Sequence, residues 1–315
     1  MCNVDKQIIV SIMGPTGVGK TALVLELFSK IPIQIISVDS VQIYKDMNIG
    51  SGKPSTEILS DFPHDLINII EPTDTYSTAK FQNDCLGAVK KAFYSDKLPF
   101  LVGGTMMYFD HLINGISQLP PTNEQVRSDI NEEFERIGAK EMYNYLRKVD
   151  LKASLKIHEN DSQRIKRALE VYKSTGKEFS KWQEDQRKEV NKLVLDSHLI
   201  QIAIQPKDKE LHREIIAKRF KKMIETGLID EVEKLLNSHN IDKNSQSMKS
   251  VGYRQVCEFL EGDISLDLMI EKAINATRQL SKRQMTWINS WKNLNIIENN
   301  SKLGSEVEKL LLKQL

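Results

Sequence analysis

Short apolar runs and stretches of helical spacing alternate along the first third of the chain. Four runs rich in β-branched and other apolar residues are expected to be strands: 8–12, 33–38, 66–70 and 98–102. A helix is expected from Thr21, and another where apolar residues recur every four positions: Phe81, Cys85, Val89 and Phe93. Strands that alternate with helices are typical of a parallel sheet covered by helices on both faces. We therefore predict an α/β fold with a three-layer core.

The pattern changes at the Pro120-Pro121 pair. Residues 119–190 are charged and have helical spacing without strand signals, which predicts an inserted helical domain. A strand run returns at 198–204, and helical segments follow it. The core is therefore expected to comprise residues 1–118 and 191–315, with the helical insertion between them.

Composition favours a reducing compartment. The chain has 315 residues and a formal net charge of +1, which neither favours nor excludes a polyanionic partner. Cys2, Cys85 and Cys257 are far apart, and none belongs to a Cys-x-x-Cys pair, so no disulfide framework or cysteine metal site is predicted. The apolar run from Ile8 to Met13 is too short for a signal peptide or a membrane span. We expect a cytoplasmic protein without a membrane segment.

The first strand and the first helix are joined by a phosphate-binding loop, or P-loop. Its pattern, G-x-x-x-x-G-K-[ST], is matched by Gly14, Pro15, Thr16, Gly17, Val18, Gly19, Lys20 and Thr21. The glycines let backbone N–H groups surround phosphate oxygens, and the helix N-terminus adds a favourable dipole. Lys20 neutralises charge, and the Thr21 hydroxyl binds Mg²⁺. The sequence therefore predicts a P-loop fold that binds a phosphate or diphosphate together with Mg²⁺.

Two polar residues follow predicted strands at the edge where ligands of open α/β sheets bind. Asp39 would act as a Mg²⁺ ligand of a nucleotide hydrolase, as a catalytic base or as a helix cap, and its place after the strand that follows the P-loop helix favours the base. Gly103-Gly104-Thr105 stands where many P-loop hydrolases carry an acid, which argues against nucleotide hydrolysis. Thr105 offers its hydroxyl to a substrate, with a turn residue as the alternative.

Basic residues gather in three places. One is the segment Gln163–Arg167 in the insertion, and another surrounds Gly252-Tyr253. The third is the stretch 272–292, which has five basic residues, no acid and two tryptophans; it overlaps the mostly helical region 265–291. Solvated helix faces would explain any one of these runs, but three of them in a nearly neutral chain favour nucleic acid, with the tryptophans as stacking surfaces.

Together these motifs resemble the bacterial tRNA dimethylallyltransferases, also called the tRNA isopentenyltransferase family. The resemblance covers nearly the whole chain and rests on the P-loop and on motifs in this order: Asp39–Tyr44 with Gly50–Pro54, Pro63-His64, Gly103–Thr105, Gln163–Arg167 with Ala168–Glu170, Arg219-Phe220, Val251–Arg254, and Thr277–Leu280 through Trp287. Two positions depart from the family pattern. Met106-Met107-Tyr108 stands in place of Gly-Leu-Tyr, and His64-Asp65 in place of His-His.

The resemblance implies transfer of a dimethylallyl group from dimethylallyl diphosphate to N6 of the adenine immediately 3′ of a tRNA anticodon. The P-loop residues would bind the diphosphate, with Lys20, Arg219 and Mg²⁺ at Thr21 stabilising the leaving pyrophosphate. Asp39 would take the N6 proton as the base attacks, and Thr105 would hold the adenine after it has been flipped out of the anticodon loop. Contacts with the tRNA are assigned by the resemblance to Asp39, Ser40, Val41, Gln42, Thr105, Arg127, Gln163, Arg164, Ile165, Lys166, Arg167, Val251, Gly252, Tyr253, Arg254, Lys282, Arg283, Gln284 and Trp287.

Other classes of protein share part of this pattern. A small-molecule kinase would use the same P-loop for ATP, but the missing acid after Val102 and the basic C-terminal helix argue against it. An RNA-binding module without catalysis would have no use for Asp39 and Thr105 at adjacent strand ends. A relative that prenylates free adenosine nucleotides would lack the C-terminal RNA elements. We expect a monomeric enzyme that binds dimethylallyl diphosphate and the tRNA anticodon stem-loop, with the insertion contacting tRNA.

Overall fold

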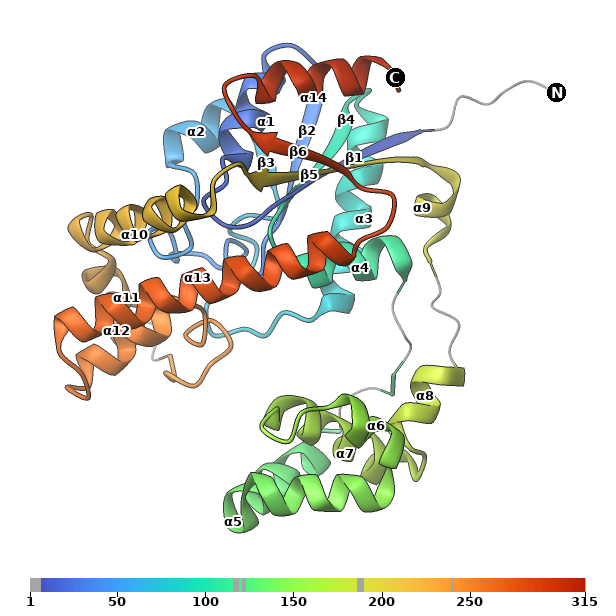
Figure 1. The fold of residues 1–315 in the computed structure, drawn as a ribbon, viewed down its shortest axis with the longest axis vertical. Coiled ribbons are helices and arrows are strands. Elements are labelled where there is room, and N and C mark those ends of the chain that lie inside the picture. Colours follow the sequence, from blue (N-terminus) through green and yellow to red (C-terminus); the bar gives the residue numbers. More distant parts are fainter. Residues whose placement is uncertain (1–6, 116–118, 121–122, 186–189, 239–240, 315) are drawn as a thin grey trace. The chain divides into compact units, whose positions relative to one another are not determined.

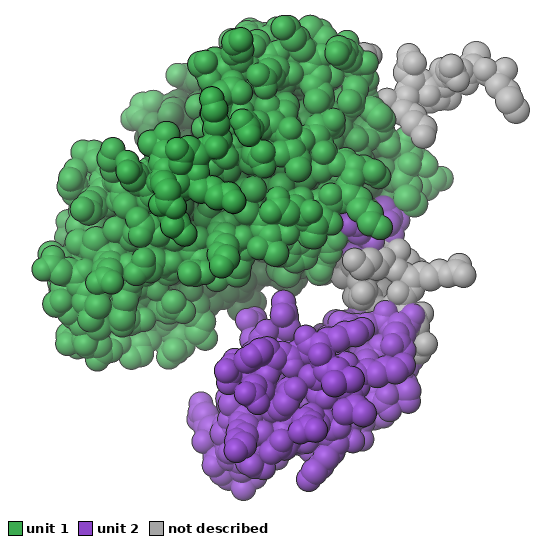
Figure 2. Space-filling view, in the orientation of Figure 1, with its two compact units in different colours: residues 1–113, 191–315 green, residues 114–190 purple. Residues whose placement is uncertain are grey.

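The structure is a computed structural model that describes residues 7–115, 119–120, 123–185, 190–238 and 241–314. Cys2, Gln118 at the expected domain boundary and Pro121 lie outside these residues. The chain divides into two compact units, residues 1–113 with 191–315 (unit 1) and residues 114–190 (unit 2), which Figure 2 colours separately. No helix in the described part of the chain is both long and apolar enough to cross a membrane.

Unit 1 is built on a parallel sheet (Figure 1). The described residues place six strands in the order β3-β2-β4-β1-β5-β6, and every neighbouring pair is parallel. The strands are β1 (Ile8–Met13), β2 (Ile33–Val38), β3 (His64–Asp65), β4 (Leu98–Gly103), β5 (His198–Pro206) and β6 (Asn295–Asn299). The apolar runs of β1, β2, β4 and β5 lie at the centre of the sheet, where helices cover both faces. The side chains of β1 and β2 are buried without alternation, and most of those of β4 are buried as well. The α/β fold class expected from the sequence is confirmed.

Helices cover both faces of the sheet. On one face α1 (Lys20–Phe28) packs with α14 (Leu303–Leu312), and both contribute to the same apolar cluster as β1 and β5. The helix α3 (Thr78–Tyr94) packs against β2 and β4, as the stripe with Phe81, Cys85 and Val89 predicts. The helix α4 (Met106–Asn114) follows β4. Two short helices complete this part of the unit, α2 (Thr56–Asp61) and α9 (Lys192–Asp196).

Two expectations for the sheet need correction. The predicted strand 66–70 is wrong, because Leu66 and Asn68 have φ values of 65° and 56°, which extended chain cannot adopt. Pairing there is limited to β3 and to a single bridge between Tyr44 and Ile70. The edge strand β6 was not anticipated, because its Ile296-Ile297 pair is too short a signal without its partner β5.

The C-terminal helices of unit 1 begin at residues that cap their first turns. Asp208 accepts hydrogen bonds at the start of α10 (Lys209–Glu225), and Ser265 does so at the start of α13 (Leu266–Ser290). These two helices pack against each other, and α12 (Tyr253–Leu260) packs on α13. The helix α11 (Leu228–Ser238) follows α10 after Gly227, which has the left-handed φ of 99° that favours glycine.

Unit 2 is entirely helical within its described residues. It comprises α5 (Glu124–Val149, kinked at Gly138), α6 (Leu151–Lys156), α7 (Ser162–Thr175) and α8 (Phe179–Asp185). Its core is formed by apolar side chains of α5, α6 and α7: Ile130, Met142, Leu146, Ala153, Ile157, Ile165, Ala168 and Leu169.

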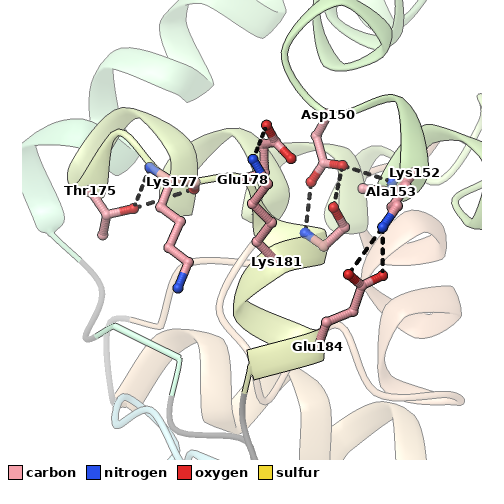
Figure 3. A network of polar contacts seen from close by, with 9 residues as sticks. Asp150, Lys152, Ala153, Thr175, Lys177, Glu178, Lys181 and Glu184 are labelled. Carbon is pink, nitrogen blue, oxygen red and sulfur yellow. Dashed lines mark hydrogen bonds and ion pairs between the residues drawn. The ribbon is translucent and has the colours of Figure 1, made fainter.

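A buried carboxylate ties the helices of unit 2 together (Figure 3). Asp150 is 2% exposed, and its oxygens accept hydrogen bonds from Ala153 N at 2.9 Å, from Ser180 N at 2.7 Å and from the Ser180 hydroxyl at 2.7 Å. A buried charge is stable only when it is hydrogen-bonded, and here three donors supply those bonds. Lys152 and Glu184 form an exposed ion pair beside it. Asp150 therefore joins the start of α6 to α8 and has a structural role.

Candidate active site

The P-loop lies at the C-terminal end of β1 and leads into α1. Gly17 and Gly19 have φ values of 78° and 93°, which glycine adopts without strain. Because Gly19 is the N-cap of α1 and has no side chain, the first amides of the helix are not capped by it and can bind an anion. The loop lines a cavity of about 430 Å³, which we call the diphosphate cavity.

The Lys20 amine lies inside this loop. Its Nζ donates hydrogen bonds to the carbonyl oxygens of Gly14 and Pro15, both at 2.9 Å. Burial lowers the pKa of Lys20 to about 8; the Asp39 carboxylate opposes this shift and the Arg219 guanidinium adds to it. A bound diphosphate would favour the charged amine, so part of the ligand's binding energy depends on this proton.

Asp39 and Thr105 end adjacent strands, β2 and β4, and each organises the turn beside it. The Asp39 Oδ1 accepts hydrogen bonds from Val41 N at 2.8 Å and Gln42 N at 3.2 Å. The Thr105 Oγ1 accepts one from Ser40 N at 3.0 Å and lies 3.4 Å from the Ser40 hydroxyl. Both side chains are partly exposed. The cap and turn interpretations of these residues therefore describe real contacts, and they do not exclude a catalytic role.

Arg219 reaches the same place from α10. Its Nη1 lies 3.5 Å from the Thr16 hydroxyl, and its Nη2 lies 3.5 Å from the Gly52 carbonyl oxygen. Burial lowers the pKa of Arg219, and the Asp39 carboxylate opposes that shift. A methyl group on Gly52 would lie 1.7 Å from Nη2, so only glycine leaves room for the guanidinium at this position.

A second cavity of about 430 Å³ adjoins the first, and we call it the acceptor cavity. Ser40, Thr105 and Met106 line it together with Lys249, Arg283 and Trp287. Both cavities are lined by Thr16, Gly17, Asp39, Ser51, Gly104, Arg219 and Gln284. Two ligands bound in these cavities would meet beside Asp39 and Arg219. Met106, one of the departures from the family pattern, lines the acceptor cavity and is not among the residues that line the diphosphate cavity.

The candidate RNA contacts of unit 1 differ in exposure. Arg254, Lys282, Arg283 and Trp287 are exposed. In contrast, Gly252, Tyr253 and Gln284 are buried, and Val251 is partly buried. The Tyr253 hydroxyl donates a hydrogen bond to Glu231 at 2.7 Å and accepts one from Ser51 N at 3.2 Å, so Tyr253 supports a loop and has no surface for RNA. Gln42 lines the diphosphate cavity and not the acceptor cavity, and its amide is bonded to Ser37 and Gly52.

In unit 2 only part of the predicted basic segment is open to solvent. Arg127, Gln163 and Arg164 are exposed, whereas Ile165 is fully buried in the helical core and presents no side-chain surface to RNA. The Lys166 amine bonds to Asn131 and lies 4.5 Å from the Phe134 ring centroid. The Arg167 guanidinium bonds to Glu170 and to the Pro120 carbonyl oxygen, both at 2.9 Å. Ile165 is the apolar residue of the segment 163–167, and the helical period places it on the inner face of α7.

Sequence reasoning did not single out Glu231. Its carboxylate accepts hydrogen bonds from three successive amides, Asn48 N at 2.9 Å, Ile49 N at 2.7 Å and Gly50 N at 3.1 Å. These bonds hold the loop whose next residues line both cavities. Three amide donors share the two oxygens of this carboxylate. The bonds join residues more than 180 positions apart, so no local sequence motif indicates them.

The described residues contain no group of three or more His, Cys, Asp or Glu side chains that could hold a metal. Mg²⁺ at a P-loop needs no such group. One hydroxyl of the protein and the phosphate oxygens of the ligand coordinate it, and water molecules occupy the remaining positions. Thr21 lines the diphosphate cavity in the first turn of α1. The site therefore fits Mg²⁺ bound through Thr21 and a diphosphate.

The fold and the two adjoining cavities are those of a P-loop protein with room for two ligands that would share the wall containing Asp39. A model of the family described as IPP transferase matches residues 42–291. The chain belongs to this family. It is 44% identical over 294 residues to tRNA dimethylallyltransferase 2 of Hahella chejuensis, covering 90% of this chain and 88% of that protein.

Solved structures agree with this assignment. The tRNA isopentenylpyrophosphate transferase of Bacillus halodurans is 30% identical, with a TM-score of 0.70 over 98% of this chain and 96% of that one. The tRNA delta(2)-isopentenylpyrophosphate transferase of Staphylococcus epidermidis is 28% identical, with a TM-score of 0.69 over 98% of this chain and 100% of that one. The family expected from the sequence motifs is confirmed, and with it tRNA dimethylallyltransferase activity.

Proposed function

We propose that the chain transfers the dimethylallyl group with the donor's diphosphate in the diphosphate cavity and the adenine 3′ of the anticodon in the acceptor cavity. The observation that carries this proposal is that the two cavities share Asp39, Arg219 and Gln284. A donor carbon and an acceptor nitrogen must approach to about 3–3.5 Å before reaction. A shared wall brings two separately bound ligands to one point.

The P-loop and Arg219 stabilise the leaving group in this proposal. Breaking the allylic C–O bond places charge on the pyrophosphate oxygens, and preorganised donors aimed at that charge lower the barrier. Lys20, the loop amides and the Arg219 guanidinium are these donors. Mg²⁺, bound through Thr21 and the diphosphate, would neutralise part of the same charge.

Asp39 is the general base. A carboxylate does not deprotonate a neutral aromatic amine in advance, but it takes the proton as N6 becomes positively charged during attack. The Val41 and Gln42 amides hold one carboxylate oxygen and thus fix the orientation of the group. The hydroxyls of Thr105 and Ser40, which lie side by side on the wall of the acceptor cavity, bond the edge of the flipped adenine.

The tRNA is bound by the exposed basic and aromatic side chains near the acceptor cavity, above all Lys249, Lys282, Arg283 and Trp287. In unit 2, Arg127, Gln163 and Arg164 are the exposed candidates for further contacts with the anticodon stem-loop. We propose that the enzyme works as a monomer. Its place is the cytoplasm, where the buried thiols of Cys85 and Cys257 stay reduced.

The test is to incubate the protein with dimethylallyl diphosphate and Mg²⁺ and to offer unmodified tRNA or AMP as acceptor. We expect prenylation of tRNA at the adenine 3′ of the anticodon, loss of transfer when the metal is chelated, and no transfer to AMP. Transfer to AMP alone would assign the acceptor cavity to free nucleotides. Full activity in the presence of chelator would remove Mg²⁺ from the proposal.

A further inference from the structure

Gln284 joins the wall of the acceptor cavity to the P-loop. Its Oε1 accepts a hydrogen bond from Thr16 N at 2.9 Å, and its Nε2 donates one to the Gly104 carbonyl oxygen at 2.8 Å. The side chain is only 7% exposed. A methyl group on Gly104 would lie 2.5 Å from Nε2, so glycine at 104 is what lets the amide approach the backbone. One side chain therefore connects α13, the turn after β4 and the P-loop.

The bond to Thr16 affects the groups that face the diphosphate. Thr16 belongs to the P-loop, whose amides ordinarily face phosphate oxygens. Here its amide is bonded to a side chain 268 positions away, and its hydroxyl is the one that Arg219 contacts. The position of Thr16 thus influences both the shape of the loop and the place of the guanidinium. The hydrogen bond from its amide ties Thr16 to Gln284.

The other side of Gln284 belongs to the acceptor cavity. Thr277, Leu280 and Trp287 lie seven and four positions before it and three positions after it, which places all of them on one face of α13. All three line the acceptor cavity together with Gln284. Gly104, its second partner, precedes Thr105, which contacts Ser40; both Thr105 and Ser40 line the acceptor cavity. A base bound in this cavity would therefore contact the face of α13 that carries Gln284 and the turn after β4 to which the Gln284 amide is bonded.

We propose that Gln284 is a positioning residue that couples binding of the acceptor to the conformation of the P-loop. RNA bound against α13 restricts the Gln284 amide, which fixes Thr16 and so holds the loop and Arg219 ready for the diphosphate. The inference rests on the proposed function, because it takes the two cavities as donor and acceptor sites. Thermodynamic linkage makes the effect reciprocal, so the diphosphate must raise the affinity for RNA by the same factor as RNA raises the affinity for the diphosphate.

The experiment measures binding at equilibrium without reaction. Inorganic pyrophosphate with Mg²⁺ is titrated into the full chain, with and without saturating unmodified tRNA. In the natural protein we expect saturating tRNA to raise the affinity for pyrophosphate about fivefold or more, which is the lower end of typical coupling between two sites. In Gln284→Met, which keeps the length of the side chain and removes both hydrogen-bonding groups, the ratio should fall to within about twofold of one.

The chain offers a matched control. Gln246 makes the same pair of bonds to backbone, accepting from Tyr76 N and donating to the Tyr76 carbonyl oxygen, both at 3.0 Å. It lines neither cavity. Gln246→Met therefore removes the same kind of pair of hydrogen bonds, at a more exposed side chain, and the coupling ratio should stay that of the natural protein. An equal loss of coupling in this control would mean that the effect comes from general destabilisation and would overturn the assignment to Gln284.

A second variant keeps the proposal testable if Gln284→Met folds poorly. Gln284→Glu retains an acceptor for Thr16 N but replaces the donor to Gly104 with an oxygen, so its coupling ratio should lie below that of the natural protein. A ratio unchanged within about twofold in either folded Gln284 variant, or a ratio of one in the natural protein, overturns the coupling role. Prenyl transfer to tRNA is assayed separately on the natural protein. Its absence would remove the proposed function, whereas normal transfer with uncoupled binding would remove only this inference.

Discussion

Replacing Asp39 with asparagine separates its two possible roles. The structure assigns Oδ1 to the Val41 and Gln42 amides, at 2.8 and 3.2 Å. An asparagine Oδ1 accepts the same bonds, and asparagine caps about as well as aspartate. The change therefore keeps the turn and removes only the negative charge and the ability to accept a proton. If Asp39 is the general base, the rate of prenyl transfer should fall by roughly 10² to 10⁴, or about 3–5 kcal/mol in activation free energy.

The loss of charge also acts on Lys20. The Asp39 carboxylate raises the pKa of Lys20, so its removal lowers that pKa below its present value of about 8. A diphosphate bound in the loop acts in the opposite direction, because it favours the charged amine. The comparison of rates is therefore made at saturating donor, where the bound diphosphate holds the amine in its charged form.

The assay is single-turnover prenyl transfer at saturating donor, with tRNA binding measured in parallel. Asp208→Asn is the matched control, because the Asp208 Oδ1 also accepts from the amides two and three positions on, at 2.8 and 3.1 Å, at the start of α10. We expect the control to stay within about twofold of the natural rate, and tRNA binding to survive in both variants. A rate for Asp39→Asn within about threefold of the natural protein would refute the assignment of the base.

Three further changes test other parts of the site. The affinity of the natural protein for pyrophosphate, divided by that of Lys20→Arg at the same pH, should fall by up to about tenfold per pH unit above about 8. The Lys20 amine loses its proton there, whereas arginine stays charged, and a ratio of affinities that does not change with pH would contradict this. Gly52→Ala should lower turnover by roughly 10² or more, because its methyl group would displace Arg219. If the double variant Gly52→Ala with Arg219→Ala loses the sum of the two single losses in activation free energy, the two residues do not act together. Lys282→Ala and Arg283→Ala should each reduce the slope of log tRNA affinity against log salt by about one, and unchanged slopes would return these side chains to the role of solvated surface.

The features that could be predicted from the sequence depend on neighbours along the chain. The P-loop is eight consecutive residues, so its pattern and its place between a strand and a helix are visible together. The central strands were found because burial on both faces requires continuous apolar runs, and the helices were found from their period. The strand predicted at 66–70 failed for a local reason as well, because apolar composition says nothing of the positive φ at Leu66.

The geometry of the active site depends on contacts between distant segments. Arg219 meets Thr16 across 203 positions, and Gln284 meets it across 268. A helical period tells which residues share a face, but packing decides what that face meets. The RNA contact predicted at Gln284 stays a prediction, whereas its bonds to the P-loop and Gly104 could be found only in the structure. The same reason explains Glu231, whose role comes from three amides in another part of the chain. Local motifs in the sequence indicate the type of reaction, whereas long-range packing determines which side chains lie close enough together to carry it out.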